Sequence, residues 1–307
     1  MSSLELVRTR DELRTVIRER VAPLVERGDA ALGLVPTMGA LHGGHGELVA
    51  AARAANDLVV ASVFVNPLQF DDPVDFARYP RDLDADLAIL EAGGVDIVFA
   101  PATEEMYPGG TPMVTVSAGE MGRRLEGASR PGHFDGVVTV VAKLFALSTP
   151  PYPCRFNAYF GQKDAQQLAI IRRLAHDLDF GVTINPVPIV RTPEGLAMSS
   201  RNQLLTQRAA SAALALSRAL GVLRDRAAAG DPLNIPEVEA QVRADDLVEL
   251  DYLEIVDPRT LRPIHLSSST PGPALALIAA RVDGIRLIDN MDLPGPIGTG
   301  DRATRKR

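Results

Sequence analysis

Hydrophobic positions follow two alternating patterns through the first part of the chain. Segments 31–35, 58–65 and 95–100 are almost continuously apolar, which is typical of strands buried on both faces of a sheet. Between them, segments 45–55 and 82–92 carry apolar residues every three or four positions, which predicts helices with one buried face. This alternation predicts a parallel sheet covered by helices, with ligands beyond the carboxyl ends of its strands.

Further elements extend this pattern on both sides. Thr9 and Glu12 have the spacing of a capping box and predict the start of a first amphipathic helix. Segment 137–147 predicts a buried helix, and 158–161 closes a short strand before another amphipathic helix. The polar segment 126–135 predicts a flexible loop over a site, with Arg130 and His133 as minor candidates.

The pattern changes after about Val190. A long helix rich in Ala and Leu is expected at 207–229, with strands at 250–256 and 274–280 and a two-residue turn at Asp283-Gly284.

We therefore expect two domains. The first, 1–189, is a Rossmann-like doubly wound parallel sheet. The second, 190–307, is a smaller C-terminal α+β lid domain with a mobile tail from about Leu293.

Composition excludes several classes of function. The 307 residues are 46% hydrophobic and 23% charged, as in ordinary globular proteins. Lys and Arg number 32 against 39 Asp and Glu, so no overall basic field attracts nucleic acid. A single cysteine, Cys154, cannot form an internal disulfide, and no apolar run reaches the roughly 18 residues of a membrane span. A cytoplasmic location is the default expectation.

The most informative stretch is Pro36-Thr37-Met38-Gly39-Ala40-Leu41-His42-Gly43-Gly44-His45, which leaves the first buried strand and enters a helix. Free N–H groups at a helix N-terminus attract anions, and the two imidazoles can donate hydrogen bonds to phosphate oxygens. Two other interpretations are a glycine-rich connection with solvated histidines, or half of a metal site. Neither CxxC nor HExxH supports a zinc site.

Two other stretches carry groups suited to phosphate. Lys163 lies where a short strand passes into a helix, although a lone lysine is more often a solvated charge. Met198-Ser199-Ser200-Arg201 offers two hydroxyls and a guanidinium, which can hold a polyphosphate. The alternative is that Ser199 and Ser200 cap a helix.

Polar residues after other strands complete the set. Gln69 follows the most apolar strand and could orient a small substrate, or simply form a turn. Asp82, Asp84 and Asp86 form an acidic first helical turn, which the helix dipole favours.

Six segments together resemble one family. The segments PTMGALHGGH, NPLQF, RYPRDLDADL, RPGHFDGV, YFGQKDAQQ and GLAMSSRN occur in the order found in the pantothenate synthetase (pantoate–β-alanine ligase) family. This family belongs to the nucleotidylyltransferase superfamily with its HxGH motif, which His42 to His45 match. The resemblance runs from about Leu6 to Asn290.

The resemblance implies an AMP-forming ligase. ATP would activate the carboxylate of (R)-pantoate as a pantoyl adenylate, and the amine of β-alanine would then form the amide, giving pantothenate, AMP and pyrophosphate. It also implies Mg²⁺, a homodimer and a second domain that closes over ATP. Alternatives are a related nucleotidylyltransferase and a nucleotide-binding module without turnover.

The resemblance also implies roles for individual residues. His42 and His45 would contact the triphosphate, with His45 as proton donor, and Lys163 and Arg201 would join them in catalysis. Gln69 and Gln167 would hold pantoate, with Gln69 also near β-alanine. The remaining ATP-binding residues would be Pro36, Thr37, Met38, Gly39, Gly161, Asp164, Val190, Met198, Ser199 and Ser200.

The family pattern is incomplete at the metal. Some members place Mg²⁺ ligands in the acidic helix, but Ala85 and Ile89 cannot coordinate, which leaves Asp86 as the matched ligand. ATP oxygens and water would then supply most of the coordination.

Overall fold

A parallel sheet forms the centre of the first part of the chain, as the alternating pattern predicts. The computed structural model describes residues 4–70, 73–264 and 273–294. Six strands lie in the order β1-β4-β3-β2-β5-β6, and each pairs in parallel with its neighbours. The strands are β1 (Glu5–Val7), β2 (Ala31–Thr37), β3 (Leu58–Val63), β4 (Ile97–Phe99), β5 (Arg155–Gly161) and β6 (Thr183–Val187).

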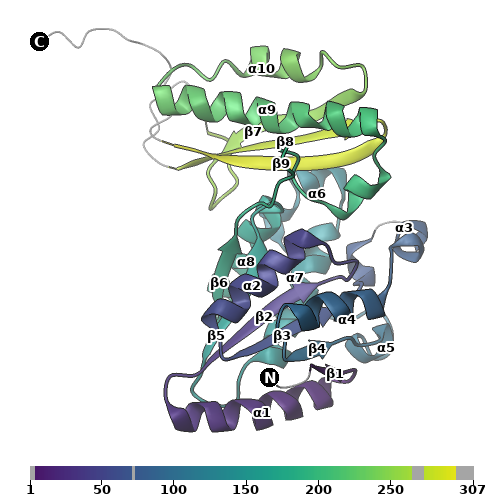
Figure 1. The fold of residues 1–307 in the computed structure, drawn as a ribbon, viewed down its shortest axis with the longest axis vertical. Coiled ribbons are helices and arrows are strands. Elements are labelled where there is room, and N and C mark those ends of the chain that lie inside the picture. Colours follow the sequence, from purple (N-terminus) through teal and green to yellow (C-terminus); the bar gives the residue numbers. More distant parts are fainter. Residues whose placement is uncertain (1–3, 71–72, 265–272, 295–307) are drawn as a thin grey trace, which may run out of the picture. The chain divides into compact units, whose positions relative to one another are not determined.

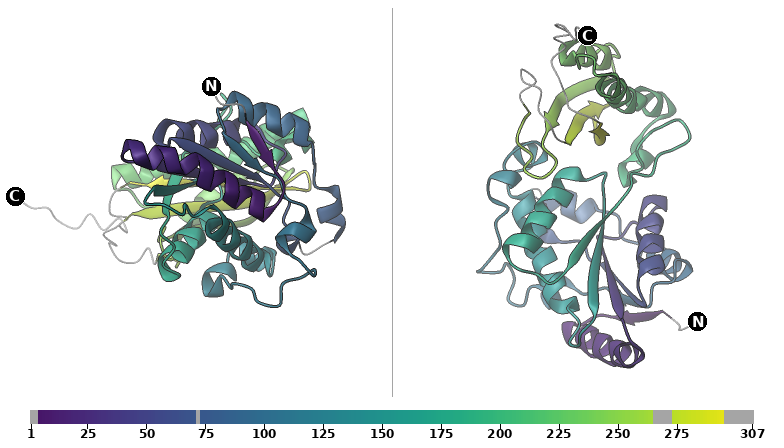
Figure 2. Two further views of the ribbon diagram at one scale, coloured as in Figure 1. Left: turned by 90° about the horizontal axis from the view of Figure 1, so that it is seen from below. Right: turned by 90° about the vertical axis from the view of Figure 1, so that its left-hand side faces the viewer.

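Helices cover both faces of this sheet. Helices α2 and α4 lie on one face, and α7 and α8 lie on the other (Figures 1 and 2). The helices of this part are α1 (Arg10–Arg27), α2 (Gly43–Ala55), η1 (Pro67–Gln69), α3 (Pro73–Arg78), α4 (Leu83–Ala92), α5 (Thr103–Met106), η2 (Gly119–Gly122), α6 (Glu126–Ser129), α7 (His133–Ser148) and α8 (Ala165–Asp177).

The core explains why these strands read as continuous apolar runs. On one face, Leu48 and Val49 of α2 and Leu90 of α4 pack with Val35 and Val59 of the sheet. Because helices also cover the opposite face, both sets of side chains along each central strand are buried. The capping box predicted at Thr9 and Glu12 is present at the start of α1.

The strand order reverses beside β2. Chain connections lead from β2 to β3 and β4 in one direction, and β5 and β6 lie on the other side of β2. In doubly wound folds, ligands bind at such a switch point, outside the carboxyl ends of the strands. Here the carboxyl end of β2 leads into the His42 to His45 stretch, and the carboxyl end of β5 is Gly161. The doubly wound fold predicted from the sequence is confirmed.

The last part of the chain forms an antiparallel sheet with helices. Strands lie in the order β7-β8-β9, and the predicted turn at Asp283-Gly284 joins the last two with positive φ angles of 50° and 80°. The elements are η3 (Ser200–Leu204), α9 (Gln207–Ala229), α10 (Ile235–Val242), β7 (Val248–Val256), β8 (Ala274–Val282) and β9 (Ile285–Leu293).

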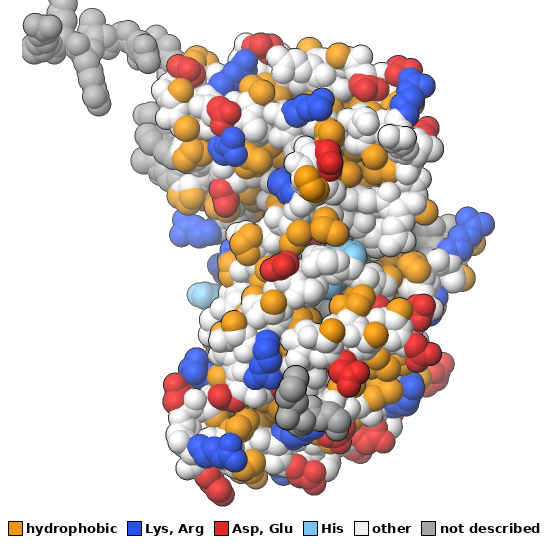
Figure 3. Space-filling view, in the orientation of Figure 1, with side chains coloured by type: hydrophobic (Ala, Val, Ile, Leu, Met, Phe, Trp, Pro, Cys, Tyr) orange, Lys and Arg blue, Asp and Glu red, His pale blue; other side chains and the backbone are white. Residues whose placement is uncertain are grey.

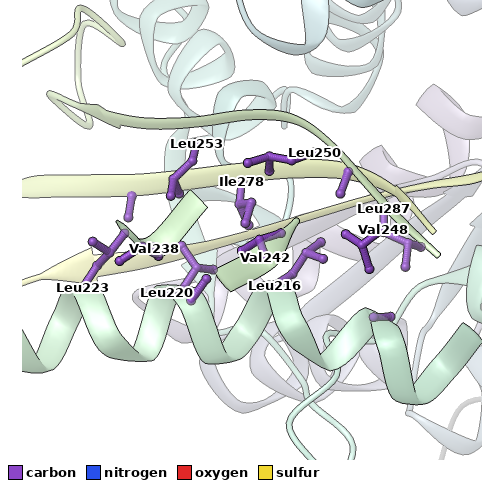
Figure 4. Packing of buried hydrophobic residues seen from close by; sticks show 14 of the residues in the cluster. Leu216, Leu220, Leu223, Val238, Val242, Val248, Leu250, Leu253, Ile278 and Leu287 are labelled. Atoms are coloured by element: carbon purple, nitrogen blue, oxygen red, sulfur yellow. The ribbon is translucent and has the colours of Figure 1, made fainter. Parts of the chain in front are cut away.

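A separate hydrophobic core holds this second sheet to its helices. Leu216, Leu220 and Leu223 lie along one side of α9 and point toward the sheet, where Ile278 of β8 meets them (Figure 4). Leu220 and Leu223 are fully buried, and burying one leucine contributes about 1.5–3 kcal/mol. The smaller α+β arrangement predicted for the C-terminal part is confirmed.

Contacts within the chain divide it into two compact units. The first comprises residues 1–162 and 166–188, and the second comprises 163–165 and 189–307. Lys163, Asp164 and Ala165 therefore pack with the second unit, although they follow a strand of the first. The tail predicted from about Leu293 lies almost entirely outside the described residues.

One predicted element is wrong. The sequence predicts a flexible loop at 126–135, but this segment contains α6 and the first turn of α7. Gln166 supplies the reason, since its Oε1 accepts from the Glu126 N–H at 3.0 Å. Its Nε2 donates to the carbonyls of Met121 and Arg124, both at 2.8 Å. A buried amide from a distant helix thus fixes this polar segment.

Candidate active site

The two histidines of the glycine-rich stretch form the N-terminal cap of α2. His42 is the N-cap residue, and its Nδ1 accepts from the backbone N–H of Gly44 at 3.1 Å. His45 reaches back, so that its Nδ1 accepts from the backbone N–H of His42 at 3.2 Å. The centroids of the two rings lie 4.2 Å apart. A capping box that ordinarily uses hydroxyl and carboxylate groups is here made of two imidazoles.

This arrangement determines which ring nitrogen carries the proton. A backbone N–H can only donate, so Nδ1 of each ring is the acceptor and Nε2 holds the hydrogen in the neutral form. Each Nε2–H is thus a donor at the N-terminus of a helix, where the dipole also favours an anion. The geometry suits the stabilisation of negative charge on a ligand.

The strand end before these histidines is closely tied to its neighbour. Thr37 is buried, and its hydroxyl donates to the Ser62 carbonyl at 2.6 Å and accepts from the Gly39 N–H at 3.2 Å. Pro36 and Met38 are partly exposed beside it. The predicted Pro36 to His45 residues thus comprise the end of β2, the connection after it and the first residues of α2.

Gln69 lies in η1, after the neighbouring strand β3, in a buried polar cluster. Its Oε1 accepts from Asn66 Nδ2 at 2.9 Å, which leaves the Gln69 amide NH₂ as its donor group. Asn66 is fully buried, and its Oδ1 accepts from the Tyr107 hydroxyl at 2.8 Å. Burial raises the pKa of Tyr107 far above its usual range, so this hydroxyl remains a donor.

His133 and Arg130 hold the backbone of Gln69. An Arg130 Nη1 lies 3.1 Å from His133 Nε2, and a guanidinium can only donate. His133 therefore carries its proton on Nδ1, which donates to the Gln69 carbonyl at 2.9 Å. Arg130 Nη2 donates to the same carbonyl at 3.3 Å. These two minor candidates thus contact Gln69, and Asn66 with Tyr107 completes the cluster.

Strand β5 and helix α8 carry two more predicted residues of the first unit. Gly161 is the last residue of β5, and Gln167 lies partly buried in the first turn of α8. The adjacent Gln166 is buried, and its side-chain amide is hydrogen-bonded to the backbone of segment 121–126.

Three of the other predicted phosphate contacts line one pocket in the second unit. Lys163, Ser199 and Arg201 line it, together with Asn202, Arg286 and Asp289 and several apolar residues. The Oδ1 of Asn202 is buried and has no hydrogen-bond partner among the described residues. The Oδ1 of Asp164 lies 3.8 Å from the ammonium nitrogen of Lys163.

Buried polar contacts fix the walls of this pocket. Asn290 Nδ2 donates to the Lys163 carbonyl at 2.8 Å. Arg191 forms a bidentate pair with the buried Asp289, at 2.6 and 2.8 Å. Arg191 Nη1 also donates to the Gly195 carbonyl at 3.1 Å. In the same turn, the Met198 N–H donates to the Val190 carbonyl at 2.9 Å, just before Ser199.

Ser199 has the alternative role that the sequence left open. It is the N-cap of η3, and its Oγ accepts from the Arg201 N–H at 3.3 Å. A hydroxyl keeps a hydrogen to donate while it accepts, so the cap does not remove it as a phosphate donor.

Charge over the visible face is mixed. Lys and Arg side chains are interspersed with Asp and Glu side chains, without a continuous field of one sign (Figure 3). No cluster of three or more His, Cys, Asp or Glu side chains suited to a metal occurs within the described ranges. Among the helices of those ranges, none is long and apolar enough to cross a membrane.

Some residues of these sites carry little signal in the sequence. Tyr107, Arg286 and Asn290 are distant along the chain from the motifs that they support, so no local spacing links them. Asn66 has a weak signal, because an Asn-Pro pair after a buried strand marks a turn.

The structure places His42, His45, Gln69, Gly161 and Gln167 in the first unit. It places Lys163, Asp164, Val190, Met198, Ser199, Ser200 and Arg201 in the second.

The chain is similar to curated proteins over most of its length. It is 53% identical over 294 residues to a pantothenate synthetase of Paenarthrobacter aurescens, covering 93% of this chain and 99% of that protein. It is 59% identical over 267 residues to one from Corynebacterium efficiens, covering 86% of this chain and 91% of that protein.

Solved structures are similar as well. The pantothenate synthetase of Thermus thermophilus superposes with a TM-score of 0.81 at 44% identity, over 94% of this chain and all of that one (100%). A pantoate–β-alanine ligase from Francisella tularensis, complexed with β-γ ATP and β-alanine, has a TM-score of 0.74 and 32% identity, covering 94% and 97% of the two chains.

A family model agrees with these likenesses. The model for pantoate–β-alanine ligase matches residues 5–292, a range that covers most of both units. The chain belongs to the pantoate–β-alanine ligase family.

Proposed function

We propose that this protein condenses (R)-pantoate with β-alanine and converts ATP to AMP and pyrophosphate. Family membership supports this reaction, and the observation that carries it into this chain is the pair of Nε2–H donors of His42 and His45 at the N-terminus of α2. They lie at the switch point of the sheet, where a nucleotide is expected.

The chemistry requires two steps. A carboxylate is a poor acyl donor, so its oxygen first attacks the α-phosphorus of ATP and pyrophosphate leaves. The free amine of β-alanine then attacks the acyl carbon of the pantoyl adenylate, the C–O bond breaks, AMP departs with that oxygen, and the nitrogen releases one proton to solvent.

Negative charge builds on the phosphate oxygens in the first step. Fixed donors aimed at such oxygens stabilise the transition state without reorganisation. We assign this role to His42 and His45. His45, the proton donor by resemblance to the family, shares its Nε2 proton with a phosphate oxygen in a hydrogen bond. The backbone hydrogen bonds at Nδ1 support the assignment because they hold each ring in the required tautomer.

Residues of both units are proposed to contact ATP. Lys163, Ser199, Ser200 and Arg201 would hold the β- and γ-phosphates, and their gathering around one pocket in the second unit supports this role, with Ser200 adjacent in sequence. The remaining nucleotide contacts would come from Pro36, Thr37, Met38, Gly39, Gly161, Asp164, Val190 and Met198.

Pantoate is proposed to bind at Gln69 and Gln167. The side-chain NH₂ of Gln69 is its donor, since Asn66 already occupies the amide oxygen. An amide donor suits both the carboxylate and the hydroxyl groups of pantoate. Gln69 would also lie near β-alanine.

Mg²⁺ is proposed to enter with ATP as part of the substrate. The described residues do not fit a metal held by protein ligands, because no cluster of three suitable side chains occurs among them. Both oxygens of Asp86 accept backbone hydrogen bonds. Phosphate oxygens and water are the ligands that Mg²⁺ ordinarily uses.

A homodimer and a cytoplasmic location are also proposed. The homodimer rests on the resemblance to the family, and the location rests on the single cysteine and the biosynthetic reaction.

The reaction can be followed in two stages. Protein mixed with ATP, Mg²⁺ and pantoate should release roughly one pyrophosphate per site, and AMP with an amide should appear only after β-alanine is added. Folded protein that forms no AMP with all three substrates would reject the ligase. A nucleotide product without an amide would support the related nucleotidylyltransferase, and bound ATP without pyrophosphate release would support a silent module.

A further inference from the structure

The turn that carries His42 has an unusual backbone. Gly39 has a φ of 84°, and the next residue, Ala40, has a φ of 52°, in the left-handed region that most side chains avoid. Two consecutive residues in this region need support from their surroundings. His42 follows directly as the N-cap of α2, so whatever holds this turn also sets where the His42 ring lies.

A single carboxylate supplies that support. Asp86 Oδ1 accepts from the Leu41 N–H at 2.8 Å, and its Oδ2 accepts from the Ala40 N–H at 3.1 Å. Hydrogen bonds to an ionised carboxylate are about twice as strong as neutral ones. Asp86 lies on α4, so a neighbouring helix fixes the turn before α2.

Gly39 allows this close approach. A Cβ at position 39 would lie 2.8 Å from Asp86 Oδ2 and 3.2 Å from Val63 Cγ1. The positive φ and the missing side chain therefore serve the same contact. Turn and carboxylate fit each other closely.

Burial separates Asp86 from the other acidic residues of its helix. Asp86 is only 3% exposed, whereas Asp82 and Asp84 are exposed to solvent. Asp82 caps the helix through the Ala85 N–H. An acidic first turn that merely favoured the helix dipole would not require a buried carboxylate directed at another segment.

We propose that Asp86 is a positioning residue, which holds the Gly39–Leu41 turn and thereby the His42 and His45 pair, and that it does not act by coordinating Mg²⁺. The inference rests on the proposed adenylation reaction for its kinetic test. The hydrogen bonds that Asp86 accepts do not depend on that reaction.

The test compares Asp86→Asn with Asp84→Asn, an exposed control on the same helix. An asparagine offers one oxygen acceptor, and its NH₂ would face the other backbone N–H. We expect Asp86→Asn to lower kcat for pyrophosphate formation by about ten- to a hundredfold, the scale of a misplaced catalytic group. The KM for ATP and the Mg²⁺ concentration giving half-maximal rate should stay near those of the unchanged protein, and Asp84→Asn should match it throughout.

Each other outcome overturns the proposal. A folded Asp86→Asn protein with unchanged kcat would remove the positioning role. A kcat restored by raised Mg²⁺ would identify Asp86 as a metal ligand. If Asp86→Asn does not fold, Gly39→Ala keeps the carboxylate but crowds it, and must show the same fall in kcat with the KM for ATP and the Mg²⁺ dependence unchanged.

A measurement on the unchanged protein needs no variant. Mg²⁺ alone, added without ATP, should leave the amide NMR signals of Ala40 and Leu41 unmoved. Saturating shifts of these signals with Mg²⁺ would contradict the proposal even if every variant unfolds. Absence of pyrophosphate formation by the unchanged protein would instead reject the proposed function and leave this part of the test standing.

Discussion

Replacing His45 with alanine should lower the rate of pyrophosphate formation from ATP and pantoate by about 10²–10³-fold, the usual cost of losing one preorganised donor. The Nε2–H of His45 is the donor, and its tautomer is set by the His42 N–H at Nδ1. Rapid-quench measurement of the first turnover reports this step directly.

Two amide variants separate the role of His45 as a donor in catalysis from its role in capping α2. His45→Asn keeps an acceptor near the Nδ1 position, so α2 should remain capped while the donor is lost. His45→Gln places an amide NH₂ near the Nε2 position and should retain part of the rate. His176→Ala is the control, since its side chain is 78% exposed. Near-normal pyrophosphate formation by folded His45→Asn would remove His45 from the mechanism.

Adding one methyl group at Gly136 should lower the free energy of unfolding by about 1–3 kcal/mol, as overpacking does. A Cβ there would lie 2.1 Å from the Leu68 carbonyl oxygen and 2.9 Å from the Gln69 nitrogen, both backbone atoms. Helix α7 therefore approaches η1 closely only because position 136 has no side chain. The displaced Gln69 should also raise the KM for pantoate.

A glycine-to-alanine substitution in α9 should instead raise the free energy of unfolding. Gly221 lies within that helix, and a Cβ there would meet no atom of another described segment within 4 Å, so Gly221→Ala should stabilise the protein by about 0.5–1 kcal/mol. Urea unfolding of both variants checks the pair. Equal stabilities of Gly136→Ala and the unchanged protein would contradict the close approach.

Much of the fold was predictable because its signal is local. Continuous apolar runs identify β2 and β3 as strands buried on both faces, and a segment rich in Ala and Leu identifies α9 at its observed bounds, Gln207–Ala229. Two strands were not predicted. β1 has three residues, and β6 contains Pro186, so neither gives a clear apolar run.

The site was predictable where its residues lie together in the chain. His42 and His45 share one helical turn, so their spacing alone brings them together. The residues that hold these site residues in place could not be predicted, because each comes from a distant segment of the chain. Asp86 reads as one of three acidic residues in a helical turn, and only the tertiary structure shows that its carboxylate meets the backbone of Ala40 and Leu41.

The adenylate is the claim on which the other assignments depend, and oxygen transfer measures it. Pantoate labelled with ¹⁸O in both carboxylate oxygens is converted with ATP and β-alanine, and the products are analysed by mass spectrometry. Attack of the carboxylate on the α-phosphorus predicts AMP that carries one ¹⁸O, with the other label in the amide carbonyl and unlabelled pyrophosphate. AMP without label, or label in pyrophosphate, would contradict it.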